Sequence, residues 1–147
     1  MAVLVDTNVL IFSIQQGHPS GEVSLRAIKF FLAADEPVCV LPQNISEFWN
    51  VCTRPADKNG LGLTPNETEN RLNRLDPILT VLHDTPLVYT KWRQLIVRHQ
   101  VSGIQVHDAR IAAAMQVHGI ARILTYNPRD FARYYGITPL RPEETIS

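Results

Sequence analysis

The chain has few cysteines and no long apolar run. Cys39 and Cys52 lie far apart in sequence and do not have the spacing of metal ligands. Two cysteines are too few for a disulfide framework, so we expect a reduced, cytoplasmic protein. Charged residues interrupt the apolar segments, as Lys29 and Asp35 do around 30–32. No segment approaches the ~20 residues of a membrane span, and the amino terminus does not resemble a secretory signal.

The chain also has no excess of positive or negative charge, because 14 Lys and Arg residues balance 14 Asp and Glu residues. This balance argues against a general nucleic-acid coat protein but permits an enzyme that contacts a few phosphates. The chain contains neither a glycine-rich phosphate loop with Lys and Ser/Thr nor a GxGxxG turn after its first apolar run. Nucleoside-triphosphate and dinucleotide chemistry are therefore not expected.

The apolar pattern alternates between short strand-like runs and helical stripes. At 147 residues the chain fits one domain, with ordinary globular values of 45% hydrophobic and 19% charged residues. The expected strands are 2–5, 38–41, 78–82, 120–125 and 137–140, and the expected helices are 20–32, 44–54, 64–76, 85–96 and 106–118. Strands separated by helices pair in parallel through right-handed crossovers. The sequence thus predicts a single domain over 1–147, a three-layer α/β/α sandwich with a central, mainly parallel sheet.

Several helix ends have clear signals. Thr64, Pro65 and Glu67 predict an N-cap, a proline at the first helical position and a capping box. The pair 85–86 repeats the threonine and proline, and Gly119 is placed as a left-handed C-cap.

Acidic residues follow the predicted strands at one edge of the sheet. Asp6 comes directly after the first strand, and Glu47 lies in the first turn of the helix after the second. The loop after the fourth strand contains Asn127 and Asp130. Strand carboxyl ends share one edge in a parallel sheet, so these side chains can converge. Asp108 opens a helix that precedes its strand, and it reaches the edge only if that helix crosses the top.

Carboxylates gathered without interleaved cations repel one another and raise their own pKa values. A hard divalent cation such as Mg²⁺ or Mn²⁺ resolves this repulsion, since both prefer oxygen ligands. Such an ion activates water and neutralises charge on a phosphoryl group. The grouping therefore indicates a metal site that acts on phosphate.

Each acid also has a purely structural explanation. Asp6 would cap a helix that starts near Asn8, and Glu47 would complete a capping box with Asn44. Asp108 would be favourable at a helix amino terminus because of the helix dipole. One acid alone does not decide between these explanations, and only the grouping favours a metal site.

Four short motifs follow one another along the chain: VDTNVL at 5–10, SEF at 46–48, HDA at 107–109 and TYNPRDF at 125–131. Together they resemble PIN-domain proteins, in particular the VapC-like ribonucleases of toxin–antitoxin pairs. The similarity extends from residue 2 to about residue 140.

The resemblance implies a Mg²⁺- or Mn²⁺-dependent endoribonuclease in which Asp6, Glu47 and Asp108 are metal ligands and catalytic residues. The most acidic version of the last motif has Asp at the position of Asn127, so either Asn127 or Asp130 completes the metal site. An inactive or weakly active PIN module that binds RNA or protein is the alternative.

The resemblance also implies RNA as substrate, a homodimer and a small antitoxin partner. Thr7 and Thr125 match hydroxyl positions that orient an acid or contact phosphate. Asn8 stands where phosphoaspartyl hydrolases need a second Asp, which argues against that enzyme class.

Other polar and aromatic residues have two explanations. His107 either contacts the scissile phosphate or supports its neighbour. Trp49 and Trp92 lie on apolar helix faces, where packing is favoured over base stacking. Cations near the predicted edge either meet RNA phosphate or are solvated at the surface: Arg54, Lys58, Arg110, Arg129 and Arg133.

Overall fold

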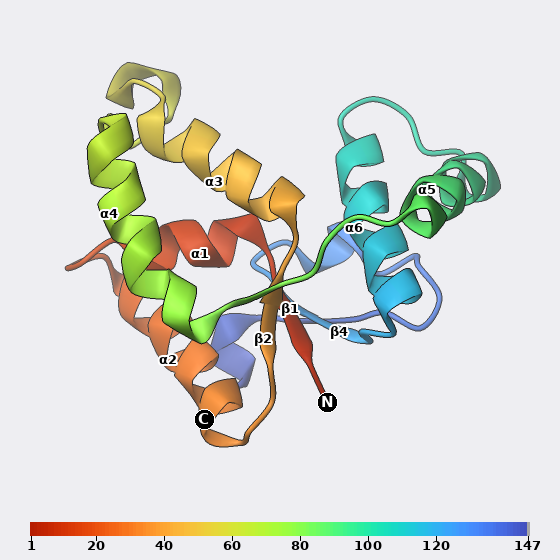
Figure 1. Ribbon diagram of the computed structural model, residues 1–147, viewed down its shortest axis with the longest axis horizontal. Coiled ribbons are helices and arrows are strands. Elements are labelled where there is room, and N and C mark those ends of the chain that lie inside the picture. The colour runs from red at the N-terminus through yellow and green to blue at the C-terminus, as the bar shows by residue number, and fades with distance from the viewer. Residues whose placement is uncertain (147) are drawn as a thin grey trace.

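A five-stranded parallel sheet forms the centre of the molecule in the computed structural model, which describes residues 1–146 (Figure 1). The strand order is β3-β2-β1-β4-β5, and every adjacent pair is parallel. The strands are β1 (Val3–Val5), β2 (Val38–Val40), β3 (Thr80–Val81), β4 (Arg122–Leu124) and β5 (Thr138–Leu140). Each lies within a predicted range, and the predicted α/β/α sandwich with a mainly parallel sheet is confirmed.

Six α-helices and four short 3₁₀ turns connect the strands of the described chain. The helices are α1 (Thr7–Ser13), α2 (Pro19–Ala33), α3 (Pro42–Thr53), α4 (Pro65–Leu75), α5 (Pro86–His99) and α6 (Gln105–His118). The turns are η1 (Ala56–Lys58), η2 (Asp76–Ile78), η3 (Pro128–Asp130) and η4 (Pro142–Glu144). Within residues 1–146, no helix is both long enough and apolar enough to cross a membrane.

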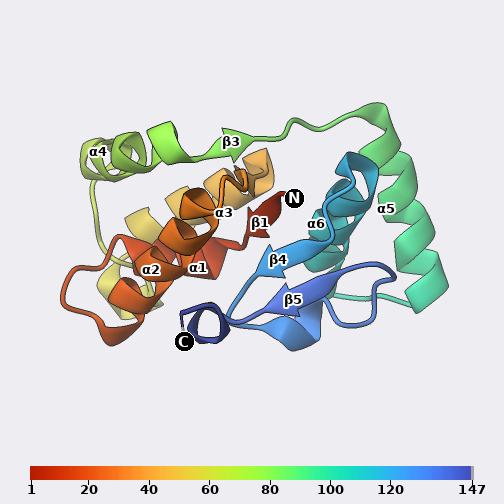
Figure 2. The same cartoon turned by 90° about the horizontal axis from the view of Figure 1, so that it is seen from below.

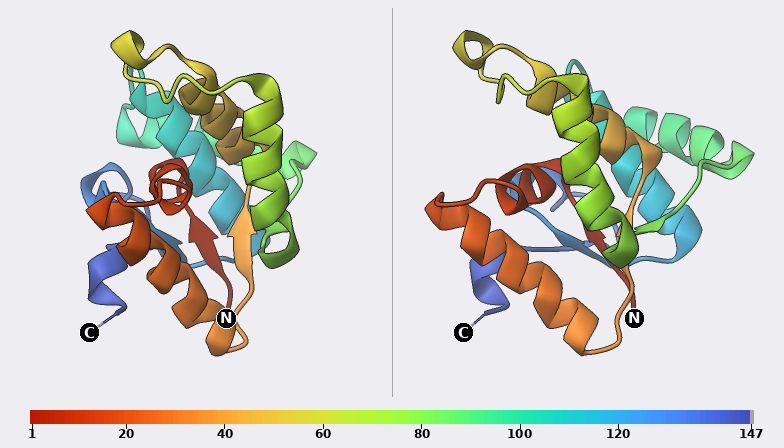
Figure 3. Two further views of the ribbon diagram at one scale, coloured as in Figure 1. Left: turned by 90° about the vertical axis from the view of Figure 1, so that its left-hand side faces the viewer. Right: turned by 60° about the vertical axis from the view of Figure 1, so that its left-hand side comes forward.

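The sheet is covered on both faces, with α5 and α6 on one side and α1 and α2 on the other (Figure 2). Helix α4 packs beside α3 (Figure 3). Alternate residues of β1 belong to the two cores: Leu4 packs with α5 and α6, whereas Val3 and Val5 pack with α1 to α4. All three are fully buried, which explains why the run is continuously apolar.

Helix α3 begins at Pro42, two residues earlier than predicted. Asn44 is therefore inside the first turn, where its Oδ1 accepts a hydrogen bond from the Leu41 N–H at 2.9 Å. The capping box suggested for Asn44 and Glu47 is wrong, because Asn44 closes the helix start with Leu41 instead. Glu47, one turn further along, is left for another role.

The two predicted threonine caps differ. Thr64 accepts from the Glu67 N–H at 3.1 Å, and Glu67 accepts from the Thr64 N–H at 3.0 Å, so this capping box is confirmed. Thr85 is the N-cap residue of α5, but its side chain makes no capping hydrogen bond. Gly119 ends α6 in the left-handed conformation with φ of 72°, as predicted.

Both tryptophans pack at the edges of the cores, as predicted. Trp49 packs against the core formed with α1 to α4, and Trp92 against the core formed with α5 and α6. The Trp92 indole also donates to the Val106 carbonyl at 2.8 Å, which ties α5 to the start of α6.

The two caps give a matched test of stability. Thr64→Ala should lower the free energy of unfolding by about 1 kcal/mol, because the Glu67 N–H loses its acceptor. Thr85→Ala should lower it less, since the Thr85 hydroxyl is buried without a hydrogen-bond partner among residues 1–146. Urea unfolding of both variants measures the difference, and a larger loss for Thr85→Ala would contradict the assignment of the caps.

Candidate metal centre

A cavity of about 320 Å³ lies at the carboxyl edge of the sheet. Figure 1 shows α3 and α6 on either side of the end of β1. The first turn of α6, which contains Asp108, therefore reaches this edge. The predicted site residues that line the cavity are Asp6, Thr7, Glu47, Asp108, Asn127 and Asp130.

Asp6 is both a helix cap and a wall of the cavity. It follows β1 directly, and its Oδ1 accepts from the Thr7 N–H at 2.8 Å at the start of α1. Its Oδ2 accepts from the Thr125 hydroxyl at 2.7 Å, just beyond the end of β4. The residue is only 8% exposed. The sheet and the helix start therefore fix this carboxylate in one orientation.

The pKa of Asp6 is raised to about 6, mainly by burial, and the nearby carboxylates of Glu47 and Asp130 contribute to this rise. The hydrogen bonds from Thr125 and Thr7 oppose this change by stabilising the charged form. Burial has the larger effect.

The pKa of Asp108 rises to about 7 for the same main reason, burial of the carboxyl group. The charges of Asp130, Asp6 and Glu47 add to the rise, and Arg133 opposes it. The four acids therefore lie within electrostatic range of one another, although they come from four separate segments of the chain.

Glu47 is held by a residue that the sequence did not reveal. The Gln43 amide Nε2 donates to Glu47 Oε1 at 3.0 Å and to the His107 carbonyl at 2.9 Å, so it joins α3 to α6. Its second partner is 64 residues away in sequence, and no local pattern signals such a bond. The His107 side chain itself is exposed.

Asn44 also supports the site from beneath. Its amide Nδ2 donates to the Thr7 hydroxyl at 3.3 Å, and the residue is fully buried. A helix-starting asparagine was visible in the sequence, but its contact with the first motif was not.

The loop after β4 contributes three polar residues to the site, and each has a different role. Thr125 is fully buried, donates to Asp6 and accepts from the Asn127 N–H at 3.0 Å, so it orients an acid. The Asn127 side chain is exposed at the cavity edge. Asp130, in η3, raises the pKa of both Asp6 and Asp108. Asp130 therefore adds a negative charge close to Asp6 and Asp108, whereas the Asn127 amide is uncharged.

The donor chemistry of the cavity fits Mg²⁺ or Mn²⁺, since carboxylate oxygens are the ligands these ions prefer. Across residues 1–146, however, no three His, Cys, Asp or Glu side chains are grouped so that they could hold an ion as they stand. Uncompensated carboxylates repel one another, and this repulsion disfavours closer approach. Metal binding therefore requires the acidic side chains to converge.

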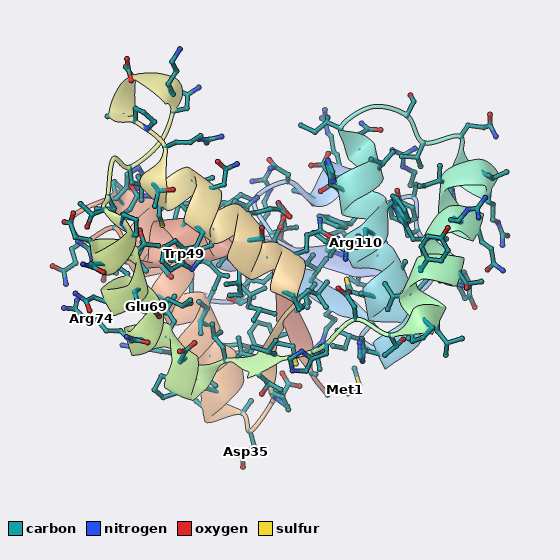
Figure 4. The ribbon with its side chains drawn as sticks, turned by 45° about the horizontal axis from the view of Figure 1, so that its top comes forward. Met1, Asp35, Trp49, Glu69, Arg74 and Arg110 are labelled. Atoms are coloured by element: carbon teal, nitrogen blue, oxygen red, sulfur yellow. The ribbon has the colours of Figure 1, made fainter. Side chains whose placement is uncertain are left out.

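A groove of about 720 Å³ continues from this cavity between α3 and α6. It shares Glu47, Asp108 and Asp130 with the cavity and adds Arg54 and Arg110. Figure 4 labels Arg110 on α6. Its guanidinium pairs with Asp84 at 3.0 Å, at the surface. The groove thus places cations beside the acids.

The raised pKa of Asp108 predicts a pH effect in the metal-free protein. The folded chain holds a proton on Asp108 up to about pH 7, whereas the unfolded chain releases it near the ordinary value of 3.8. Stability contributed by Asp108 should therefore fall as pH rises from about 4 to 7. In chelator, Asp108→Asn should become more stable than the wild type as pH rises. Melting temperatures across this range test it, and a difference independent of pH would refute it.

Solved structures share this architecture. VapBC2 from Rickettsia felis, bound to a DNA fragment from their promoter, matches with a TM-score of 0.71 and 15% identity, covering 96% of this chain and 98% of that chain. DNA-bound VapBC from Salmonella typhimurium matches with a TM-score of 0.71 and 20% identity, covering 97% and 98%. VapC20 from Mycobacterium tuberculosis, a sarcin–ricin loop cleaving toxin, matches with a TM-score of 0.65 and 19% identity, covering 94% and 100%.

These identities show a common fold, and no curated protein sequence matches the chain. The family model described as the PIN domain matches residues 3–137, a span that includes all four acids. The resemblance of the sequence motifs to PIN proteins is thereby confirmed, and the chain belongs to the PIN-domain family.

Proposed function

We propose that the protein is a metal-dependent endoribonuclease that hydrolyses RNA phosphodiester bonds, formed by a single PIN-like domain over residues 1–147. The observation that carries this proposal is the gathering of Asp6, Glu47, Asp108 and Asp130 around one cavity. Folding alone does not require repelling carboxylates to be gathered at one cavity, and the raised pKa values of Asp6 and Asp108 support a site that favours a cation.

Asp6, Glu47, Asp108 and Asp130 would hold Mg²⁺ or Mn²⁺, with Asp130 in place of the acid missing at Asn127. A bound ion supplies activated water and neutralises charge on the phosphoryl group. The chain itself orients Asp6 through hydrogen bonds from the Thr7 N–H and the Thr125 hydroxyl, which also oppose the rise in its pKa. Asp108, whose pKa is raised to about 7, would have to release its proton for its carboxylate to hold a cation.

The groove beside the acids supports RNA as the substrate. A phosphate backbone would meet repulsion from the acidic cavity alone, but Arg54, which forms no ion pair within residues 1–146, lines the continuing groove with Arg110, which pairs with Asp84. Cations placed beside a carboxylate cluster attract the phosphates that flank the bond to be cut.

The structural relatives support a role as a toxin. One is named as a sarcin–ricin loop cleaving toxin, and others are VapBC proteins or a toxin–antitoxin complex from Klebsiella pneumoniae. By this likeness we propose a small antitoxin partner, and from the resemblance of the sequence motifs to PIN-domain proteins we propose a homodimer.

An inactive or weakly active PIN module that binds RNA or protein is the second candidate. Two observations favour it: Asn127 replaces an acid, and no three acidic side chains in residues 1–146 are already grouped for an ion. Metal binding and cleavage separate the two candidates.

Cleavage of a structured RNA in the presence of Mn²⁺ should depend on the acidic cavity. Asp6→Asn and Asp108→Asn should each lower the rate by more than about 100-fold, since even residues that only support metal ligands contribute 10–100-fold. Glu69→Gln, at an exposed acid on α4, is the matched control and should cleave normally (Figure 4). Equal cleavage by the wild type and both Asn variants would refute the nuclease assignment.

Mn²⁺ should also stabilise the folded protein, because only the folded chain assembles the four acids. At 100 times the dissociation constant the gain is about 2.7 kcal/mol, seen as a higher melting temperature. Asp130→Asn should reduce this shift, whereas Asn127→Ala should retain it. The reverse order would identify Asn127 as the fourth ligand, and no shift for the wild type at millimolar Mn²⁺ would favour the inactive module.

A further inference from the structure

A second large cavity, of about 890 Å³, lies between α5, α6 and the segment that follows η3. Lys91, Arg98 and Arg133 line it, and its lining contains no Asp or Glu. The cavity is therefore lined by cations without acids, although the whole chain has no net charge. None of the three cations forms an ion pair within residues 1–146, whereas other arginines do: Arg110, Arg122 and Arg141. The cavity therefore presents positive charge that the described chain does not neutralise.

Arg133 connects this basic cavity with the acidic site. Its guanidinium donates to Gln105 Oε1, and Gln105 lines the groove that also contains Glu47 and Asp108. Arg133 thus lines the basic cavity and contacts a residue of the groove, so it lies where the two meet.

Aromatic side chains accompany the cations. Tyr135 is 90% exposed, and its carbonyl accepts from the Gln116 amide at 3.0 Å, which holds the backbone at the cavity wall. Tyr134 lies beneath, packed edge-on against His99 with ring centroids 5.1 Å apart. Its buried hydroxyl has no hydrogen-bond partner among residues 1–146. An exposed ring beside unpaired cations is the combination with which proteins bind single-stranded nucleic acid.

A cavity of about 660 Å³ on the other side of the sheet provides a contrast. It is also lined by cations without acids, namely Lys29, Arg71 and Arg74, but its lining contains no aromatic residue. Arg71 donates to the Ile14 carbonyl, away from the acidic groove. Figure 4 shows Arg74 on α4, across the molecule from Arg110 on α6. Positive charge alone therefore does not distinguish the two cavities; the aromatic rings and the link through Arg133 do.

We propose that single-stranded RNA running out of the acidic site continues into the basic cavity. Lys91, Arg98 and Arg133 contact successive phosphates, and an unpaired base stacks on Tyr135. This inference rests on the proposed function for the choice of RNA as the ligand, and it adds a binding track that extends the site beyond the four acids.

Binding of a short, unstructured, fluorescent RNA in chelator tests the track, because no metal is present to support cleavage. The double variant Lys91→Gln/Arg98→Gln should bind more weakly, and its slope of log Kd against log salt should fall by about 0.7 for each cation removed. The matched control, Lys29→Gln/Arg74→Gln, removes the same charges from the other cavity and should bind like the wild type. Tyr135→Ala should weaken binding by about fivefold or more, and Tyr135→Phe should restore it.

Equal weakening by the two double variants would overturn the track in favour of general charge attraction. Unchanged binding in Lys91→Gln/Arg98→Gln, or no RNA binding by the wild type, would also overturn it. Melting temperatures confirm that each variant is folded. A wild type that binds through this cavity but fails to cleave with Mn²⁺ would remove the nuclease assignment and keep the track. A wild type that cleaves RNA, together with unchanged RNA binding in Lys91→Gln/Arg98→Gln, would keep the nuclease assignment and remove the track.

Discussion

The site depends on an ionisable carboxyl group that the fold keeps almost out of water. Asp6 sits at the carboxyl end of the central strand, and its desolvation alone would favour the neutral form. Two hydrogen bonds, from the Thr7 N–H and the Thr125 hydroxyl, stabilise its charge and also join α1 to the end of β4. The negative charges of Glu47 and Asp130 have the opposite effect and destabilise the charged form of Asp6. A cation in the cavity would offset the repulsion between these carboxylates. The hydrogen bonds that join α1 to the end of β4 would then also hold Asp6 in place for the metal.

Parallel strand pairing explains why distant residues meet there. Asp6 follows β1 and Asp130 lies in the turn after β4, and these two strands are neighbours in the sheet. Glu47 comes from α3, which follows β2 on the other side of β1. Asp108 alone does not follow a strand, and it reaches the edge from the first turn of α6. Gln43 joins α3 to α6 there, through its hydrogen bonds to Glu47 and to the His107 carbonyl. The position of α6 at the site thus depends on contacts between segments far apart in sequence.

Much of this was predictable from the sequence, because strand order and helix starts have local signals. The five apolar runs became the five strands, and the motif residues Asp6, Glu47, Asp108 and Asp130 came to line one cavity. The start of α3 was misplaced, since Asn44 resembles an N-cap but closes the helix from within its first turn. Gln43 and the link from Arg133 to Gln105 gave no signal, because each joins side chains or carbonyls from segments far apart in sequence. Local patterns predict elements, and long-range polar contacts appear only once the elements are packed.

The absence of net charge has a different meaning once the fold is known. A balance of 14 cations and 14 acids argued against a protein that coats nucleic acid, and a local enzyme site was the remaining possibility. Folding separates these charges: four acids share the small cavity, while Lys91, Arg98 and Arg133 line a larger one without an acid. Since screening limits electrostatic attraction to about 8–10 Å in physiological salt, a phosphate responds to the nearest charges and not to the total. The RNA track that we propose therefore requires the basic cavity to lie close to the acids, and the Arg133–Gln105 contact joins the two regions.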